Sequence, residues 1–210
     1  MAKYQGEKKS GKMGDKIYTS YLGNPYVRRM PEFVANPRTE AQQAHRNAFV
    51  AISRLASDLK EVHLIGLHKH AQRQKPKLNT FSDFKKLNKD CCVGGVISYC
   101  SVIVSKGPVD NVNITSVELD EQHVLHVTFE CEVTDKNKGD SLGLFIYCPD
   151  LRACHALQPV LRTAEVVTEP LPEEFAGHEL HLYGFLQDKK LRTSDTLYVA
   201  IPVANHIQSL

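Results

Sequence analysis

The spacing of hydrophobic residues divides the chain into a helical region and a strand-rich region. Between residues 37 and 59, apolar residues recur three or four positions apart, which predicts an amphipathic helix that ends there or at His63. Asn36 fits the N-cap, Pro37 the first helical position and Glu40 the first turn. The predicted buried stripe comprises Ala41, Ala44, Ala48, Ile52, Leu55 and Leu59. A second, shorter helix is predicted over TFSDFKKLNK, with Phe81, Phe84 and Leu87 as its contacts.

From residue 95 onward, apolar and polar residues alternate, which is typical of strands with one buried face. The predicted strands are 96–104, 112–119, 123–133, 141–148, 157–167, 178–187 and 195–202. Turn signals such as KGPVDN and DKNKGD separate them, and seven short alternating strands in this length favour an antiparallel sandwich. Its predicted core contains Leu125, Val127, Phe129, Leu144, Ile146, Leu180 and Leu182.

The N-terminal part differs from both regions. Residues 1–14 are polar and rich in glycine and lysine, which predicts a flexible basic arm. Around a Gly-Asn-Pro break, β-branched and aromatic residues predict a hairpin of strands 16–21 and 25–30, which Pro31 ends.

The predicted fold class is therefore α+β: an N-terminal β-hairpin and long helix attached to a C-terminal antiparallel Ig-like β-sandwich of about seven strands. The predicted domains are a basic arm at 1–14, a hairpin and helical region at 15–93, and an Ig/fibronectin-III-like sandwich at 94–210. The segment LPEEFAGHELHLYGF resembles the approach to the penultimate strand of a fibronectin type III or immunoglobulin-like domain, with Leu180 at the position that often holds a corner tyrosine.

Charge is divided in the same way as hydrophobic spacing. Residues 1–90 hold 18 Lys and Arg against 8 Asp and Glu, a net charge of +10, whereas residues 91–210 hold 8 against 16, a net charge of −8. A basic half joined to an acidic half can attract copies of itself or hold a polyanion.

One longer resemblance covers about 40 residues of the N-terminal half. The run contains Gly11, Lys12 and Gly14, then Tyr-Val-Arg at 26–28, and then Asn-Pro-x-Thr-x-x-Gln at 36–42. It resembles the opening of a family of uncharacterised proteins of similar length found in Bacteroidetes genomes. The resemblance brings no reaction and no catalytic residues, and it implies a structural module of a phage or mobile element.

Candidate chemistry is sparse. GEKKSGKM approaches the phosphate-binding pattern G-x-x-x-x-G-K-[ST], but Met13 replaces the hydroxyl and no strand–loop–helix context is predicted. His63, His68 and His70 lie close in sequence without a completing Cys or carboxylate, so a polar helix end is favoured over a metal site. The six cysteines are irregularly spaced and are predicted to be reduced thiols. We expect no catalytic residue, no cofactor and no metal, and hence no enzyme.

The remaining hypotheses concern binding. The first is a non-enzymatic structural or assembly protein, forming a homo-oligomer or contacting other structural proteins through its basic half. The alternative is a nucleic-acid-binding accessory protein using the same half, because tyrosines interleave its cations. The candidate interface residues are Lys12, Lys16, Tyr18, Tyr21, Tyr26, Arg28, Arg29, Arg38 and Arg46. No run is long and apolar enough for a membrane span and no signal peptide is evident, so a cytoplasmic site of synthesis or a phage-like particle is expected.

Overall fold

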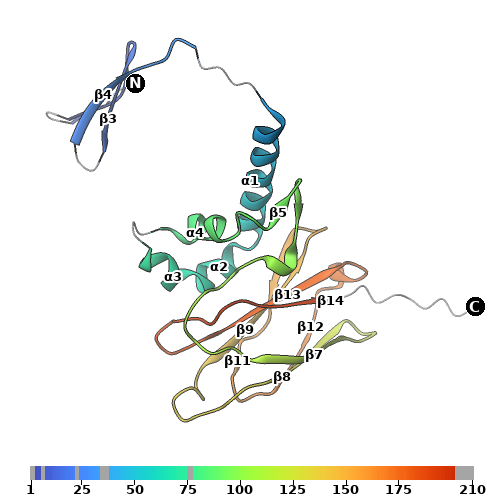
Figure 1. Cartoon of the computed structure of the whole chain (residues 1–210). Coiled ribbons are helices and arrows are strands. Elements are labelled where there is room, and N and C mark those ends of the chain that lie inside the picture. Colours follow the sequence, from blue (N-terminus) through green and yellow to red (C-terminus); the bar gives the residue numbers. More distant parts are fainter. Residues whose placement is uncertain (1–2, 6–7, 22–23, 34–37, 75–77, 202–210) are drawn as a thin grey trace, which may run out of the picture. The chain divides into compact units, whose positions relative to one another are not determined.

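A computed structural model describes residues 3–5, 8–21, 24–33, 38–74 and 78–201 of the chain (Figure 1). The chain forms two compact units, residues 1–40 and residues 41–210. These bounds differ from the three predicted segments, because the helices share a core with the strands that follow them.

The first unit is a four-stranded antiparallel sheet with strand order β1-β2-β3-β4. Its strands are β1 (Lys3–Gln5), β2 (Lys8–Met13), β3 (Lys16–Tyr21) and β4 (Asn24–Arg29). β3 and β4 form the hairpin that the sequence predicts. β1 and β2 occupy most of the segment predicted as a flexible arm, and the described part of that segment is paired strand. Gly14 permits this arrangement, since its φ of +60° suits the tight turn between β2 and β3.

The second unit begins with four helices: α1 (Glu40–Asp58), α2 (Lys60–Gly66), α3 (His68–Arg73) and α4 (Thr80–Leu87). The long helix and the short helix of the sequence prediction correspond to α1 and α4. Asn36 and Pro37, the predicted cap and first helical residue, lie outside the described residues. Helical hydrogen bonds continue across Leu59 and Leu67, where the chain bends, so α1 to α3 form one interrupted helical run.

The strands of the second unit form two larger antiparallel sheets and a small ribbon. One sheet has the order β12-β8-β7, and the other has the order β10-β9-β13-β14 with β11 also paired to β9. The bounds are β5 (Cys92–Val93), β6 (Val96–Ile97), β7 (Asn113–Leu119), β8 (Val124–Glu130), β9 (Ser141–Cys148), β10 (Ala153–Ala156), β11 (Val160–Leu161), β12 (Val166–Pro170), β13 (Leu180–Gln187) and β14 (Leu197–Ile201). Short 3-10 helices η1 (Tyr99–Ser101) and η2 (Glu173–Phe175) interrupt the connections.

Two predicted strands are corrected by the structure. The predicted strand 96–104 is regular only in β6, which pairs with β5. Beyond η1, Asn88 bonds both the N–H and the C=O of Ile103, and the amides of Val104 and Ser105 donate to Thr196, so side chains replace a neighbouring strand. The predicted strand 157–167 is divided between β11 in one sheet and β12 in the other.

The two larger sheets enclose one hydrophobic core, and the helices enclose a second with the other face of β9 and β13. Figure 1 shows the order of these layers, with the helices and the sheet of β7, β8 and β12 on opposite sides of β9 and β13. All seven predicted core residues are buried in the first of these cores. On the opposite face of β9 and β13, Phe145, Tyr183 and Phe185 pack in the core formed with the helices, together with Leu55 of α1 and Phe84 of α4. The central sheet is thus covered on both faces, by helices on one side and by strands on the other.

Candidate functional site

The predicted interface residues of the first unit lie on two faces of its sheet. Paired residues share a face, so Lys12, Ile17 and Arg28 form one cross-strand row, with Tyr26 two residues along on the same face. We call this surface the Lys12 face. The opposite face carries Lys16 and Arg29 in one row, and Tyr18 with Val27 in the next. The sequence-based set of contact residues is therefore split in two.

The remaining candidates lie elsewhere. Tyr21 lies in β3, but its side chain is outside what the structure describes. Arg38 precedes α1 with a φ of +50°, and Arg46 lies on the exposed first half of that helix. Neither belongs to the sheet.

The cations of the sheet whose side chains the structure describes are all exposed but differ in their ion pairing. Arg29 lies 3.6 Å from both Asp15 and Glu32 and is therefore partly neutralised. Lys12 and Arg28 have no ion pair within the described residues, which leaves the Lys12 face basic. No described side chain of residues 10–33 is buried, and Tyr26 and Val27 are each about half exposed, at 48% and 51%. This sheet has no core of its own among the residues described.

The glycine and lysine pattern near the N-terminus is part of a strand. Gly11 and Lys12 lie in β2 and pair with Tyr18 and Ile17. A phosphate-binding loop needs a strand, a loop and then a helix. Here β2 is followed by a turn and β3, so this segment does not have the geometry of that loop.

An acidic hollow of about 500 Å³ lies in the second unit, where β8 ends beside the start of β12. Glu130 and Glu165 line it and are both exposed, and Val133 and Val166 add half-exposed apolar surface. The buried Arg162 also lines it, 3.6 Å from Asp140. We call this the Glu130 hollow. Its rim combines negative charge with accessible apolar atoms.

A second hollow, of about 330 Å³, is basic. Lys69 and Arg73 reach it from α3, Lys106 and Gly107 from the segment before β7, and Arg192 from the β13–β14 connection. We call it the Lys106 hollow. His70 and Asp195 also line it. The two hollows thus present opposite charge to solvent.

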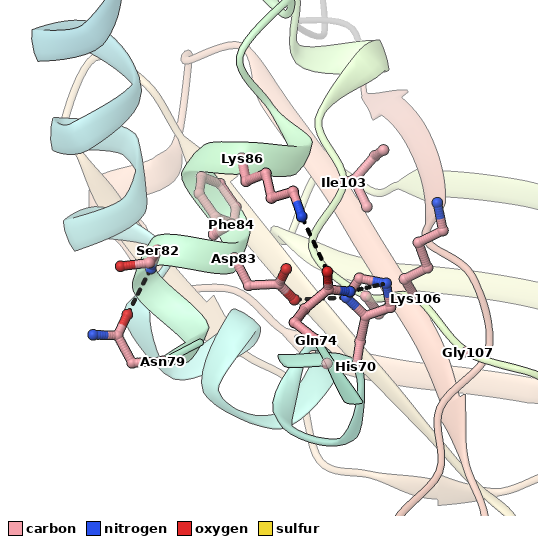
Figure 2. Close-up of polar contacts among 12 residues, drawn as sticks. His70, Gln74, Asn79, Ser82, Asp83, Phe84, Lys86, Ile103, Lys106 and Gly107 are labelled. Carbon is pink, nitrogen blue, oxygen red and sulfur yellow. Dashed lines mark hydrogen bonds and ion pairs between the residues drawn. The ribbon is translucent and has the colours of Figure 1, made fainter. Parts of the chain in front are cut away.

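A chain of polar contacts fixes α3 against α4 beside the Lys106 hollow (Figure 2). His70 Nδ1 donates to Asp83 Oδ2 at 2.6 Å, and the Asp83 side chain is fully buried. Gln74 lies 3.4 Å from the other ring nitrogen of His70, and its carbonyl oxygen accepts from Lys86 Nζ at 3.0 Å. Because a carboxylate only accepts, the short contact assigns the proton to Nδ1. His70 is thereby held in one orientation.

Close backbone contacts fix the other walls of the Lys106 hollow. A Cβ added at Gly107 would lie 2.0 Å from the carbonyl oxygen of Thr193, so only glycine allows this approach. Gly107 N–H donates to Asp195 Oδ1 at 3.2 Å, and Thr193 Oγ1 donates to the Gly66 carbonyl at 2.9 Å. Three segments distant in sequence are therefore joined at one point.

The three clustered histidines lie apart from one another, and two of the cysteines are unreactive. His63 is buried against the Ala56 carbonyl, His68 contacts Gln72 and His70 contacts Asp83, so the three do not converge. Among the described residues no group of His, Cys, Asp and Glu has metal-binding geometry. Burial raises the pKa of the Cys91 thiol to about 11 and that of Cys154 to about 12, so both thiols stay protonated at neutral pH.

Sequence reasoning missed both hollows. Lys69, Lys106 and Arg192 belong to three segments, and no local spacing connects them. The available signal was the run HKHAQR, which places two further cations around His70. Local spacing favours a polar helix end for this run over a metal site, and it does not indicate the cations that the fold adds from Lys106 and Arg192.

Comparison with protein families gives one match. Residues 8–200 match a family of unknown function, DUF6266, and the chain belongs to this family. No curated protein matches it. Within the described residues, no helix is long and apolar enough to cross a membrane. The family description names neither an organism nor a particle, so the Bacteroidetes and phage associations stay predictions.

Proposed function

We propose that this DUF6266 protein is a non-enzymatic assembly protein whose β1–β4 sheet docks onto a second copy of the chain. One observation carries the proposal: the sheet presents exposed apolar and basic residues, and none of its described side chains is buried. Small isolated sheets are marginal in water and gain stability from a packing partner. A partner surface would supply the missing burial.

Charge complementarity favours a second copy as the partner. The Lys12 face offers Lys12 and Arg28 around Ile17, with the half-exposed Tyr26 beside them. The Glu130 hollow offers two carboxylates beside Val133 and Val166. Opposite charges around apolar surface are the arrangement that guides association and sets its orientation. Because the two surfaces differ, the contact is heterologous and generates a ring or an open filament.

Sedimentation velocity on the full chain tests this contact. At low salt, we expect the sedimentation coefficient to rise with protein concentration, and the double variant Lys12→Glu/Arg28→Glu to stay monomeric. Glu130→Lys/Glu165→Lys should have the same effect. Mixing the two double variants should restore assembly, because the reversed Lys12 face of one variant then meets the reversed hollow of the other, and the unchanged face meets the unchanged hollow. Glu173→Lys/Glu174→Lys, which makes the same charge change at two exposed residues of η2, should assemble normally.

Two outcomes would redirect the proposal. A wild-type chain that stays monomeric at low salt and high concentration would exclude self-assembly. In that case, fluorescence anisotropy with a labelled single-stranded oligonucleotide tests the alternative of nucleic-acid binding, since Tyr26 lies beside two cations on one face. Salt-sensitive binding of the oligonucleotide that Lys12→Glu/Arg28→Glu abolishes would favour nucleic acid as the partner.

The same proposal includes an immunoglobulin-like topology for the two larger sheets. In that fold the first, second and fifth strands share one sheet, while the third, sixth and seventh share the other, with an added strand beside the third. β7, β8 and β12 are adjacent in the order β12-β8-β7, and the order β10-β9-β13-β14 matches the second sheet. Backbone NOEs that join Val127 to Val167 and Leu144 to Gly184 would test these pairings in solution.

A further inference from the structure

The Lys106 hollow holds an excess of positive charge. The side chains of Lys69, Arg73 and Lys106 make no hydrogen bond or ion pair within the described residues, whereas Arg192 is held by Asp188 at 2.7 Å. Asp195 is the one carboxylate among the residues that line the hollow, and one of its oxygens already accepts from Gly107. Three cations therefore face a single carboxylate that is already engaged.

These cations come from walls that are already fixed. The buried Asp83 holds His70 and with it α3, which carries Lys69 and Arg73 (Figure 2). The segment that carries Lys106 is joined to α2 by the bond from its own amide to the Gly66 carbonyl, at 3.4 Å. Holding like charges near one another costs energy in the free protein, and a bound anion relieves that cost. Because the backbone of the walls is held in place before binding, the ordering entropy that opposes the ligand is confined to these three side chains.

We propose that the Lys106 hollow binds a phosphate group, either as inorganic phosphate or as the phosphate ester of a small molecule. A phosphate dianion has oxygens on all sides, so it can accept from Lys69, Arg73 and Lys106 together, and a guanidinium can donate to it twice. A carboxylate carries half the charge and matches three cations less well. Arg73 and Lys106 are exposed at the rim, so the rest of an ester has room to project into solvent. The site shares no residue with the proposed assembly surfaces, so this proposal is independent of the proposed function.

Isothermal titration calorimetry on the full chain, at constant ionic strength in chloride buffer, tests the proposal. Inorganic phosphate should bind saturably with one site per chain. Loss of one charge-assisted contact should weaken binding about tenfold, so Arg73→Gln and Lys106→Gln should each raise the Kd by that factor. Lys136→Gln removes one exposed cation from the loop between β8 and β9 and should leave the Kd unchanged.

Further ligands separate the sources of the phosphate group. Glycerol 3-phosphate that binds more tightly than inorganic phosphate would identify an ester as the ligand, and the reverse order would identify free phosphate. Acetate should bind at least tenfold more weakly, and equal binding of acetate would overturn the phosphate assignment. The proposal also fails if neither phosphate compound binds saturably, or if both variants bind as tightly as wild type. Circular dichroism checks that each variant is folded, and the exposed Lys106 provides the variant least connected to the core.

Discussion

At the scale of single residues, the aromatic side chains of the strands show how burial sets stability. Phe129 of β8 is 1% exposed and lies between the two sheets. Phe129→Ala should lower the free energy of unfolding by about 3–5 kcal/mol, through lost burial and the cavity left behind. Val166→Ala on the neighbouring β12 removes a half-exposed side chain and should change it by less than about 0.5 kcal/mol. Urea unfolding followed by circular dichroism measures both values, and equal effects would contradict the position of Phe129 in the core.

Gly66 shows a case in which helix propensity points in the wrong direction. Alanine in place of a helical glycine ordinarily stabilises by about 0.5–1 kcal/mol. At Gly66, the last residue of α2, the new Cβ would lie 2.3 Å from the Val104 carbonyl oxygen and 2.8 Å from Ser105 Cβ. Gly66→Ala should therefore destabilise by about 1–3 kcal/mol. A rise in melting temperature would show that the segment before β7 does not contact α2 in solution.

Two buried histidines predict a dependence of stability on pH. Burial lowers the pKa of His63, as does nearby Lys60, and burial also lowers the pKa of His181, against a smaller opposing effect of Glu179. Both pKa values lie below the ordinary value of 6.5, so the unfolded chain takes up protons before the folded chain does. Stability should be full above about pH 7 and should fall as the pH decreases through about 6.5. Urea midpoints between pH 7.5 and 5.5 measure the decline, and a His63→Gln/His181→Gln variant should show a shallower one.

At the scale of elements, α1 has two unlike halves. Ala41 and Ala44, predicted for the buried stripe, are exposed, whereas Ile52, Leu55 and Ala56 are buried in the core beneath the helices. The alanines match the helical period, but no described residue of the second unit buries them. The period identifies the apolar face of a helix and does not show how much of that face a partner covers. The sequence thus predicted the helix and overestimated its contact.

Hydrogen exchange should report this difference within α1. Amides of residues 44–50 have helical bonds but few tertiary contacts, so they can open without disturbing the core. Amides of residues 54–58 should exchange only with unfolding of the helical layer. Mass spectrometry of peptides from the two halves measures the protection, and equal protection of both would indicate that another surface covers the first half.

At the scale of the whole molecule, the two units should be separable. Both hydrophobic cores are built from residues 52–201, and none of the described residues 10–33 is buried. Deleting residues 1–33 should therefore leave the second unit folded with nearly the same melting temperature at a concentration where the full chain is monomeric. It should also abolish the concentration dependence of sedimentation. A large loss of melting temperature would mean that the first unit contributes to the core.

What the sequence predicts at this scale is limited by distance along the chain. The alternation of apolar and polar residues was sufficient to predict β9. Its bounds match the predicted strand, and its aliphatic residues face the other sheet. It could not show that Phe145 and Tyr147, on the opposite face, pack under helices encoded about 90 residues earlier. The hollows have the same origin, since Lys69, Lys106 and Arg192 meet only through the fold.

Because the central sheet is covered on both faces, the core beneath the helices can form only late in the synthesis of the chain. The apolar side of α1 and α2 leaves the ribosome well before β9 and β13, the strands that bury it, have been made. At about 5–20 residues per second, the interval between Ile52 and Phe185 is about 7–27 s. Until β9 is made, Leu55, Leu59 and Val62 have no native partner in the sheet, and their partners are complete only when β13 follows, so the nascent chain exposes an apolar helix face to its surroundings. Holding by a chaperone, or slow collapse on the ribosome, would protect this helix until translation reaches the last strands.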